Sequence, residues 1–386
     1  KDLVVAHEWQ RIDENLERHR VDRFGGTARF LSPNRIEIRS TTGHVAIDGD
    51  VVLIATGSSP HRPPHIPFDG ETVCDSDTIL AMSRIPRTLA VVGAGVIGCE
   101  YASMFAALGV EVHLVDGRTS LLPHIDREIA AVLLGEMQQR LGVTLHLGAD
   151  VDVIEKRDAG VTLTLKNATR IEVDKVLYAA GRSSNTADLN LEAAGVKTGN
   201  RGVIIVDETY RTSAPNIYAA GDVIGFPALA STSMEQARVA MVHAFNLKYK
   251  QAMAATLPYG IYTIPELSTI GLTEENCRER GIDFECGRAT FRNNARGQIV
   301  GDENGMIKLV FDAKDLRILG VHIVGENASE LLHTGMMAMQ FGGTINAFID
   351  SVFNFPTLGE SYKYAAYDGL GNIARRNVSF PERREA

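Results

Sequence analysis

Cysteine, long apolar runs and excess positive charge are all scarce in this chain of 386 residues. Its four cysteines form no C-x-x-C pair and are too few for a disulfide framework or a cysteine metal site, so we expect a reducing, cytoplasmic setting and no metal. The longest apolar runs, such as Val51–Thr56, fall far short of the ~20 residues that span a bilayer. A formal net charge of −9 without a basic block offers no electrostatic footprint for nucleic acid or an anionic membrane. The sequence therefore predicts a soluble globular protein whose partners are small molecules.

The N-terminal stretch is the first feature that departs from an ordinary domain. The chain begins with Lys1 rather than methionine, and residues 4–23 place apolar side chains at helical spacing, among them Val5, Trp9 and Ile12. No apolar h-region is present, so the stretch is not a signal peptide. Because a domain that opens within a helix lacks a natural start, we expect an N-terminal piece to precede Lys1.

The order of the predicted elements indicates several modules. Short strands are expected at 27–30, 35–40, 44–47 and 50–56, before a proline-rich crossing stretch. From residue 86 strands alternate with helices at 97–108 and 126–141, which is typical of βαβ units and a parallel sheet. That part closes with strands at 161–165 and 171–179. Strands at 202–206 and 217–219 and a helix at 232–248 follow, and residues 258–376 form an α+β module of three strands and a helix at 328–340.

A glycine-rich turn joins the expected strand 88–92 to the helix after it. Gly93, Gly95 and Gly98 form G-x-G-x-x-G, in which the first glycine makes the tight turn, the second lets the backbone approach a pyrophosphate, and the third lets helix pack on strand. The next strand ends at Asp116, which can accept a hydrogen bond from a ribose 2′-hydroxyl. A plain strand–turn–helix would not require this acidic strand end, so the sequence predicts a dinucleotide site. Its predicted residues also include Val96, Ile97 and Glu100 at the start of the helix.

The choice between NAD and NADP rests on two neighbouring charges. Asp116 favours a free 2′-hydroxyl and repels a 2′-phosphate, whereas the Arg118 guanidinium two residues later can bind that phosphate. Arg118 can equally be a solvated loop charge. The pair predicts NAD-type binding that tolerates NADP.

Three further segments resemble the two-dinucleotide-binding flavoprotein reductases. The segment 212–222 ends in Gly221 and Asp222 and is similar to the second flavin motif of that family. Residues 54–57 resemble its A-T-G segment, and residues 178–182, with Asn185, resemble its A-x-G-R-x-x-N segment. The resemblance implies FAD binding, with Asp222 on the ribityl chain. The residues implied for FAD are Thr56, Gly57, Gly221, Asp222, Ala228, Leu229 and Ala230, and Gly181 is implied for the nicotinamide dinucleotide.

The segment around Pro356 separates this chain from the disulfide reductases of the family. In its disulfide reductases a His before the Pro and a Glu after it form the acid–base dyad that serves the thiols. Here Pro356 and Glu360 match, but Phe355 stands where the His would be, and a phenyl ring cannot carry a proton. Phe355 is expected to be a core or interface side chain, and no catalytic residue is predicted. Hydride transfer between nicotinamide and flavin needs no such dyad, because the cofactors carry the chemistry.

Nearly the whole chain, from Lys1 to about Arg376, is similar to the soluble pyridine nucleotide transhydrogenases, which have an aromatic residue before this Pro. The expected fold class is α/β, with two Rossmann-like dinucleotide-binding domains, the flavin one incomplete, and a C-terminal α+β dimerisation domain. The family's first flavin motif is absent, which is consistent with the expected missing piece. The domains are predicted as 1–85 (flavin), 86–182 (nicotinamide), 183–257 (flavin), 258–376 (dimerisation) and 377–386 (tail).

The resemblance implies a Si-specific NAD(P)⁺ transhydrogenase that uses FAD, NAD and NADP. NADPH would reduce the flavin by hydride transfer and dissociate, and NAD would then bind at the same site and accept the hydride from the flavin. A homodimer or higher homo-oligomer is implied as well. Two alternatives stay open: a disulfide reductase of the dihydrolipoamide dehydrogenase type, which Phe355 opposes, and a non-catalytic dinucleotide-binding fragment.

Overall fold

A computed structural model describes residues 2–377, so the predicted tail lies, beyond Asn377, outside the described residues. The chain forms two compact units. Unit 1 comprises residues 1–59 and 183–253, and unit 2 comprises residues 60–182 and 254–386. The chain passes between the units near β5 (Ser58–Pro60) and β14 (Arg182–Ser184) and again after residue 253.

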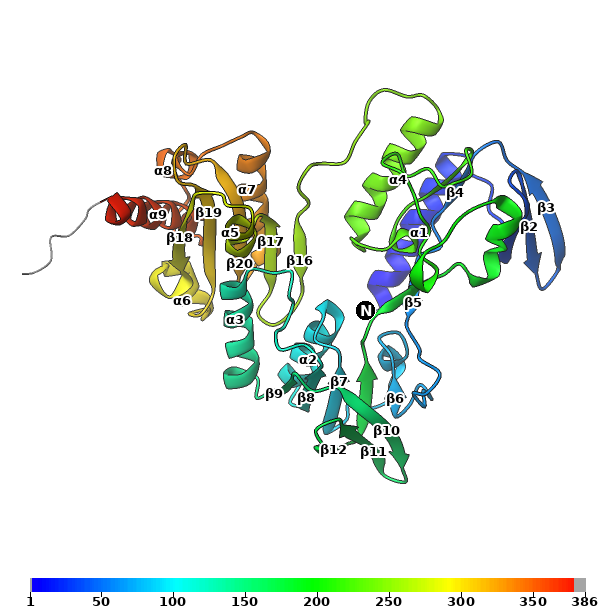
Figure 1. The fold of residues 1–386 in the computed structure, drawn as a ribbon, viewed down its shortest axis with the longest axis horizontal. Coiled ribbons are helices and arrows are strands. Elements are labelled where there is room, and N and C mark those ends of the chain that lie inside the picture. The colour runs from blue at the N-terminus through cyan, green and yellow to red at the C-terminus, as the bar shows by residue number, and fades with distance from the viewer. Residues whose placement is uncertain (1, 378–386) are drawn as a thin grey trace, which may run out of the picture. The chain divides into compact units, whose positions relative to one another are not determined.

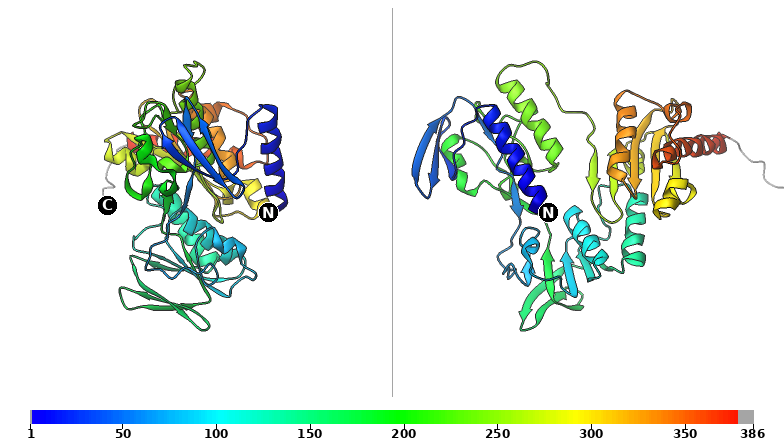
Figure 2. Two further views of the ribbon diagram at one scale, coloured as in Figure 1. Left: turned by 90° about the vertical axis from the view of Figure 1, so that its right-hand side faces the viewer. Right: turned by 180° about the vertical axis from the view of Figure 1, so that it is seen from behind.

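Unit 1 is built from two separate stretches of chain. The apolar side chains Ile54 of β4 and Ile217 of β15 share a buried core with Phe30 of β1, and β4 and β15 pair in parallel. The N-terminal helix carries no buried residue and stands as a separate helix in Figure 2. The elements of this unit are α1 (Asp2–Arg18), the antiparallel meander β1 (Thr27–Ser32), β2 (Arg35–Ser40) and β3 (Gly43–Asp48), then β4 (Val52–Ile54), β15 (Ile217–Ala219) and α4 (Ala230–Ala244).

The first part of unit 2 is a five-stranded parallel sheet of order β6-β13-β7-β8-β9. Two helices cover one face with a large apolar core, and an antiparallel meander covers the other (Figure 1). The strands are β6 (Val73–Cys74), β7 (Thr88–Val92), β8 (Glu111–Asp116), β9 (Thr144–Leu147) and β13 (Lys175–Tyr178); the helices are α2 (Val96–Ala107) and α3 (Arg127–Gly135); the meander is β10 (Val151–Arg157), β11 (Gly160–Leu165) and β12 (Arg170–Val173).

The second part of unit 2 is an antiparallel sheet of order β16-β17-β20-β19-β18. Alternate residues of β19 point to opposite faces, and Ile307, Leu309 and Phe311 join a core with α7 and α9. The strands are β16 (Tyr259–Ile261), β17 (Leu267–Gly271), β18 (Phe284–Thr290), β19 (Met306–Asp312) and β20 (Ile318–Val324); the helices are α5 (Glu274–Glu279), α6 (Ala295–Val300), α7 (Ala328–Gln340), α8 (Asn346–Asp350) and α9 (Ser361–Asn377).

A buried ionic cluster occupies the other face of that sheet. Lys308 is 1% exposed, and its Nζ lies 2.9 Å from both carboxylate oxygens of Asp126, 2.8 Å from Glu128 and 2.6 Å from Glu274. Arg288 donates to Glu128 and Glu274 at 2.7 and 2.8 Å. These five residues, the Lys308 cluster, join the start of α3, which packs on the parallel sheet, to the antiparallel sheet. The side-chain oxygen Oδ1 of Asp126 also caps α3, accepting from the amides of Glu128 and Ile129.

Several predicted elements differ from the observed ones for local reasons. No strand forms at 202–206, because Arg201 and Gly202 adopt left-handed φ values of 53° and 77° and turn the chain there. The single expected strand 171–179 is two, since the chain leaves the meander at Asp174, whose side chain accepts from the amides of Arg87 and Thr88, and enters the parallel sheet. Beyond Gly135, residues 136–140 widen into a π-helical turn rather than continuing α3.

The boundary expected at 85/86 also differs from the observed one at 59/60. Because β6 pairs with β13 in the parallel sheet, residues 60–85 belong to unit 2. Strands β16 and β18 were not anticipated either. Between residues 2 and 377 no helix combines the length and apolar character that a bilayer crossing requires.

Candidate functional site

The glycine-rich turn between β7 and α2 has the close contacts that its spacing predicts. Gly93 has φ +110°, and a β-carbon there would lie 2.8 Å from the carbonyl oxygen of Ala179. A β-carbon on Gly98 would lie 1.7 Å from the carbonyl oxygen of Gly93. Gly95, in contrast, has no neighbouring atom within 4 Å of its β-carbon position. Two glycines are therefore required by the fold itself, and the third leaves open space at the start of the helix.

That space is suited to a dinucleotide phosphate. Helix α2 begins at Val96, followed by Ile97, and Gly95 precedes it without any side-chain cap, so the first amides of the helix lack a side-chain acceptor. Such amides and the helix dipole favour an anion. A cavity of about 210 Å³ lies at the carboxyl ends of the neighbouring strands, where open α/β sheets bind ligands. Among its lining residues are Gly93, Asp116, Ala149, Asp150 and Tyr178.

The carboxylate of Asp116 at the end of β8 is almost enclosed and makes four hydrogen bonds. Its Oδ1 accepts from the amide and Nε of Arg118 at 2.8 and 2.9 Å, and its Oδ2 accepts from the amide of Ala94 at 2.6 Å and Nη2 of Arg118 at 2.7 Å. Burial alone would raise the pKa of Asp116, but these bonds outweigh it and hold the pKa below its usual value. Asp116 therefore stays ionised and ties the glycine turn to Arg118.

The other two predicted nucleotide residues, Glu100 and Gly181, each accept a backbone hydrogen bond within unit 2. Glu100 on α2 accepts the amide of Tyr262 at 2.8 Å, and burial raises the pKa of its carboxyl above the usual value despite that bond. Gly181 follows β13 with φ +112°, and its carbonyl accepts the amide of His61 at 3.0 Å. Their contact with a nucleotide stays a prediction.

In unit 1 two segments far apart in sequence meet. Thr56 donates through Oγ1 to the carbonyl of Asn185 at 2.8 Å, and the Asn185 amide group donates back to the carbonyl of Thr56 at 3.0 Å. The backbone amide of Asn185 also donates to the carbonyl of Gly57 at 3.0 Å. The A-T-G and G-R-x-x-N segments, each a weak motif on its own, are thus joined by three hydrogen bonds.

The second predicted flavin segment lies where β15 runs into α4. Gly221 has φ +82° and donates its amide to Gln236, a buried side chain that sequence reasoning missed. Asp222 accepts from Ser58 Oγ at 3.0 Å, which places it beside the segment that follows Gly57. Helix α4 begins at Ala230, after Ala228 and Leu229, and has no side-chain cap. The uncapped amides and the grouped polar side chains fit an anionic or hydrogen-bonding ligand such as a flavin.

Phe355 and Glu360 stand in the segment between α8 and α9. Phe355 is 72% exposed, so it is not a core side chain of this chain, and the interface role stays a prediction. Glu360 accepts from the hydroxyl of Tyr364 at 3.3 Å. Two residues separate Phe355 from the 3₁₀ turn Leu358–Glu360. That Phe355 stands where the related disulfide reductases have a proton-carrying His stays a prediction from the sequence resemblance.

The four cysteines are all buried free thiols, as expected of small apolar side chains. Burial raises the pKa of Cys99 to about 12 and raises those of Cys74, Cys277 and Cys286.

We expect Ellman's reagent to modify none of the four thiols in the native chain at pH 7.5, because the thiolate is the reactive form and each sulfur is enclosed. All four should react after unfolding in guanidinium chloride. A thiol that reacts rapidly in the native chain would show that its sulfur is accessible, and that cysteine would then be a candidate for redox chemistry.

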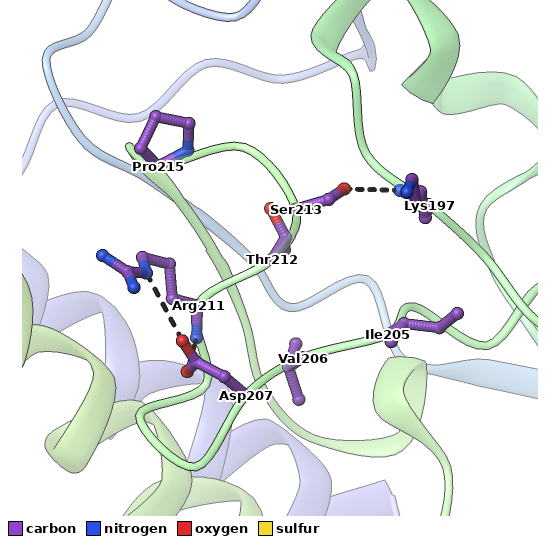
Figure 3. A pocket seen from close by; sticks show the side chains of 8 residues that line it. All are labelled: Lys197, Ile205, Val206, Asp207, Arg211, Thr212, Ser213 and Pro215. Carbon is purple, nitrogen blue, oxygen red and sulfur yellow. Dashed lines mark hydrogen bonds and ion pairs between the residues drawn. The ribbon is translucent and has the colours of Figure 1, made fainter.

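A separate pocket of about 460 Å³ in unit 1 contains none of the predicted site residues (Figure 3). Its polar groups bind one another: the Arg211 side chain pairs with Asp207, and Ser213 Oγ accepts the amide of Lys197. Over the described residues, no three His, Cys, Asp or Glu side chains are grouped to hold a metal ion.

Comparisons with known proteins agree with this geometry. The model of the pyridine nucleotide-disulphide oxidoreductases matches residues 6–244, and that of their dimerisation domain matches residues 257–366. A soluble pyridine nucleotide transhydrogenase of Mycobacterium bovis is 43% identical over 97% of this chain and 80% of its own length. Another, from Pseudomonas putida, is 44% identical over 92% of this chain and 77% of its own.

Solved structures show the same fold. LpdA from Mycobacterium tuberculosis superposes with a TM-score of 0.87 at 28% identity, over 95% of this chain and 81% of that one. The HOCl-induced flavoprotein disulfide reductase RclA from Escherichia coli superposes with a TM-score of 0.84 at 30% identity, over 90% of this chain and 79% of that one. With both family models and these relatives covering nearly all of it, the chain belongs to the pyridine nucleotide-disulphide oxidoreductase family.

Proposed function

We propose that this chain is a flavin-dependent transhydrogenase of the Si-specific type that moves a hydride from NADPH to NAD in the cytoplasm. The observation that carries the proposal is Phe355, because it removes the proton carrier that disulfide reduction requires while leaving hydride transfer possible. The transhydrogenases among the relatives, at 43–44% identity, support the same reaction.

The chain's own residues bind and orient the reactants. Gly95 and the first amides of α2 would hold a pyrophosphate, and Asp116 and Arg118 would lie beside the ribose that distinguishes NAD from NADPH. Thr56, Gly57 and Asp222 would hold FAD, which supplies a hydride acceptor and donor when bound. One nicotinamide site used in turn by donor and acceptor predicts ping-pong kinetics.

The test is hydride exchange by the full chain supplied with FAD. We expect NADPH to reduce thionicotinamide-NAD⁺ with parallel lines in double-reciprocal plots, and lipoamide or glutathione disulfide to be reduced poorly. Efficient disulfide reduction would favour a dihydrolipoamide dehydrogenase-type enzyme instead. Nucleotide binding without any flavin uptake or turnover would indicate a non-catalytic fragment.

A homodimer is part of the proposal. Several apolar side chains between Phe341 and Tyr364, within the residues that match the dimerisation model, are exposed; Val352 is 95% exposed, and Phe341, Phe355 and Tyr364 are also exposed. Isolated exposed apolar residues are ordinary, but several in one region are typical of an interface.

Replacing Phe355 with glutamate is expected to weaken the dimer roughly 100- to 1000-fold, because a central interface change costs about 2 kcal/mol and a two-fold interface contains it twice. Sedimentation velocity at matched concentrations measures this. Ile299→Glu, at an apolar position on α6 that is 64% exposed, serves as the control and should leave the dimer unchanged. If both variants behave alike, the interface does not include Phe355.

A further inference from the structure

The carboxylate of Asp116 has no acceptor position left for a ribose. An ionised carboxylate offers about four lone-pair sites, and four N–H groups already fill them. Two are the backbone amides of Ala94 and Arg118, which are fixed by the fold. The other two are Nε and Nη2 of the Arg118 side chain. A ribose hydroxyl can therefore reach Asp116 only where the guanidinium withdraws.

The guanidinium is free to withdraw into solvent. The Arg118 side chain is 49% exposed and can exchange the carboxylate for water or another anion, whereas the side chain of Asp116 is 8% exposed and stays in place. The two amides stay on the carboxylate when Arg118 leaves, so the buried charge keeps hydrogen-bond partners. The surroundings are acidic, since Asp150 and Asp152 line the same cavity, and a 2′-phosphate there needs a cation beside it.

We propose that Asp116 and Arg118 form an exchangeable ion pair that lets one site take both NAD and NADPH. Arg118 leaves Asp116 to bind the 2′-phosphate of NADPH, and in NAD the 2′-hydroxyl donates to an oxygen that Arg118 has vacated. This deepens the proposed function and rests on it, because it assumes that both nucleotides use the glycine-rich turn. In the free protein the guanidinium thus competes with the 2′-hydroxyl of NAD for the same oxygens.

The competition makes an unusual prediction for Arg118→Gln. NADP⁺ should bind roughly 10- to 100-fold more weakly, since the charged hydrogen bonds to its phosphate are lost. NAD⁺ should bind about two- to fivefold more tightly, because its competitor has gone. Arg118→Lys keeps the charge but loses the bidentate geometry, so its affinities for NADP⁺ and NAD⁺ should lie between those of the wild type and of Arg118→Gln. Asp116→Asn should lower the affinity for NAD⁺ and leave that for NADP⁺ unchanged or higher.

Isothermal titration calorimetry of the full chain with NAD⁺ and NADP⁺ measures these affinities without turnover. Arg87→Gln, before β7 at the opposite end of the strands, is the matched control and should change neither affinity. An Arg118→Gln affinity for NAD⁺ that falls or stays the same overturns the exchange, as does an equal loss for both nucleotides. A wild-type chain that binds only one of the two nucleotides, or neither, overturns the proposed function and the exchange together.

Discussion

Replacing Gly95 with alanine is expected to remove most pyridine nucleotide affinity without destabilising the protein. The backbone of Gly95 is extended, with φ −80° and ψ −171°, and nothing lies within 4 Å of its β-carbon position, so alanine fits the free chain. The added methyl group would instead occupy the space where the pyrophosphate approaches. Overpacking of this kind costs about 1–3 kcal/mol, so the affinity for NADH should fall roughly 10- to 100-fold. Titration calorimetry gives the affinity, and the Tm should stay within about 2 °C of wild type.

Gly135→Ala is the matched control. Gly135 lies at the end of α3 in helical conformation, also without a neighbour at its β-carbon position. Alanine there should leave nucleotide affinity unchanged and stabilise the chain by about 0.5–1 kcal/mol. An unaltered NADH affinity in Gly95→Ala would show that the nucleotide does not approach this turn. A marked fall in the Tm of Gly95→Ala would show that the turn has no room for a methyl group at Gly95.

The largest expected loss of stability comes from Lys308→Met. This change removes the buried cation and leaves Asp126, Glu128 and Glu274 with less compensating charge. Breaking a buried ion pair from one side costs about 3–5 kcal/mol, which corresponds to a fall in Tm of roughly 6–20 °C for a unit of this size. Differential scanning calorimetry measures it. Lys314→Met, at an exposed position after β19, should shift the Tm by about 2 °C or less.

The pH dependence separates a charge effect from a packing effect. In the wild type, burial alone would raise the pKa of Asp126, but its ionic and hydrogen-bond partners lower it, so its contribution is present above the unfolded-state pKa and is lost as pH falls. In the variant we expect the pKa of Asp126 to rise, which gives the opposite slope. The stability difference between the two proteins should therefore shrink between pH 7 and about pH 4. A difference that is constant with pH would indicate lost packing instead.

The nucleotide turn could be predicted from sequence because its geometry is local. Gly93 and Gly98 meet atoms of the same strand–turn–helix or of the adjacent strand, and Asp116 ends the next strand along the chain. The hydrogen-bond state of Asp116 was not predictable, since it depends on the rotamer of Arg118 and on the amide of Ala94. Spacing placed the carboxylate correctly but could not show that its oxygens are filled.

The Lys308 cluster shows where sequence reasoning ends. Lys308 reads as one polar residue within an apolar strand, and its partners come from α3 and α5. No spacing rule links those positions, because only the tertiary fold brings them together. The strand wrongly predicted at 202–206 has a different cause. The continuous apolar run 203–206 suggested a strand, but Gly202 at its start adopts a left-handed conformation that turns the chain there.

The divided chain of unit 1 has a consequence for synthesis on the ribosome. Val52 in β4 pairs with Ile217 in β15, so β4 has no partner strand until β15 has been synthesised. Closing so long an unfolded loop between β4 and β15 costs entropy. The parallel sheet of unit 2, which lies between them in sequence, has its own strands and core and can fold first, so that the chain ends that enter and leave it come closer together. We infer an order in which the inserted sheet forms before unit 1 closes, and nascent β4 is the edge that needs protection from aggregation meanwhile.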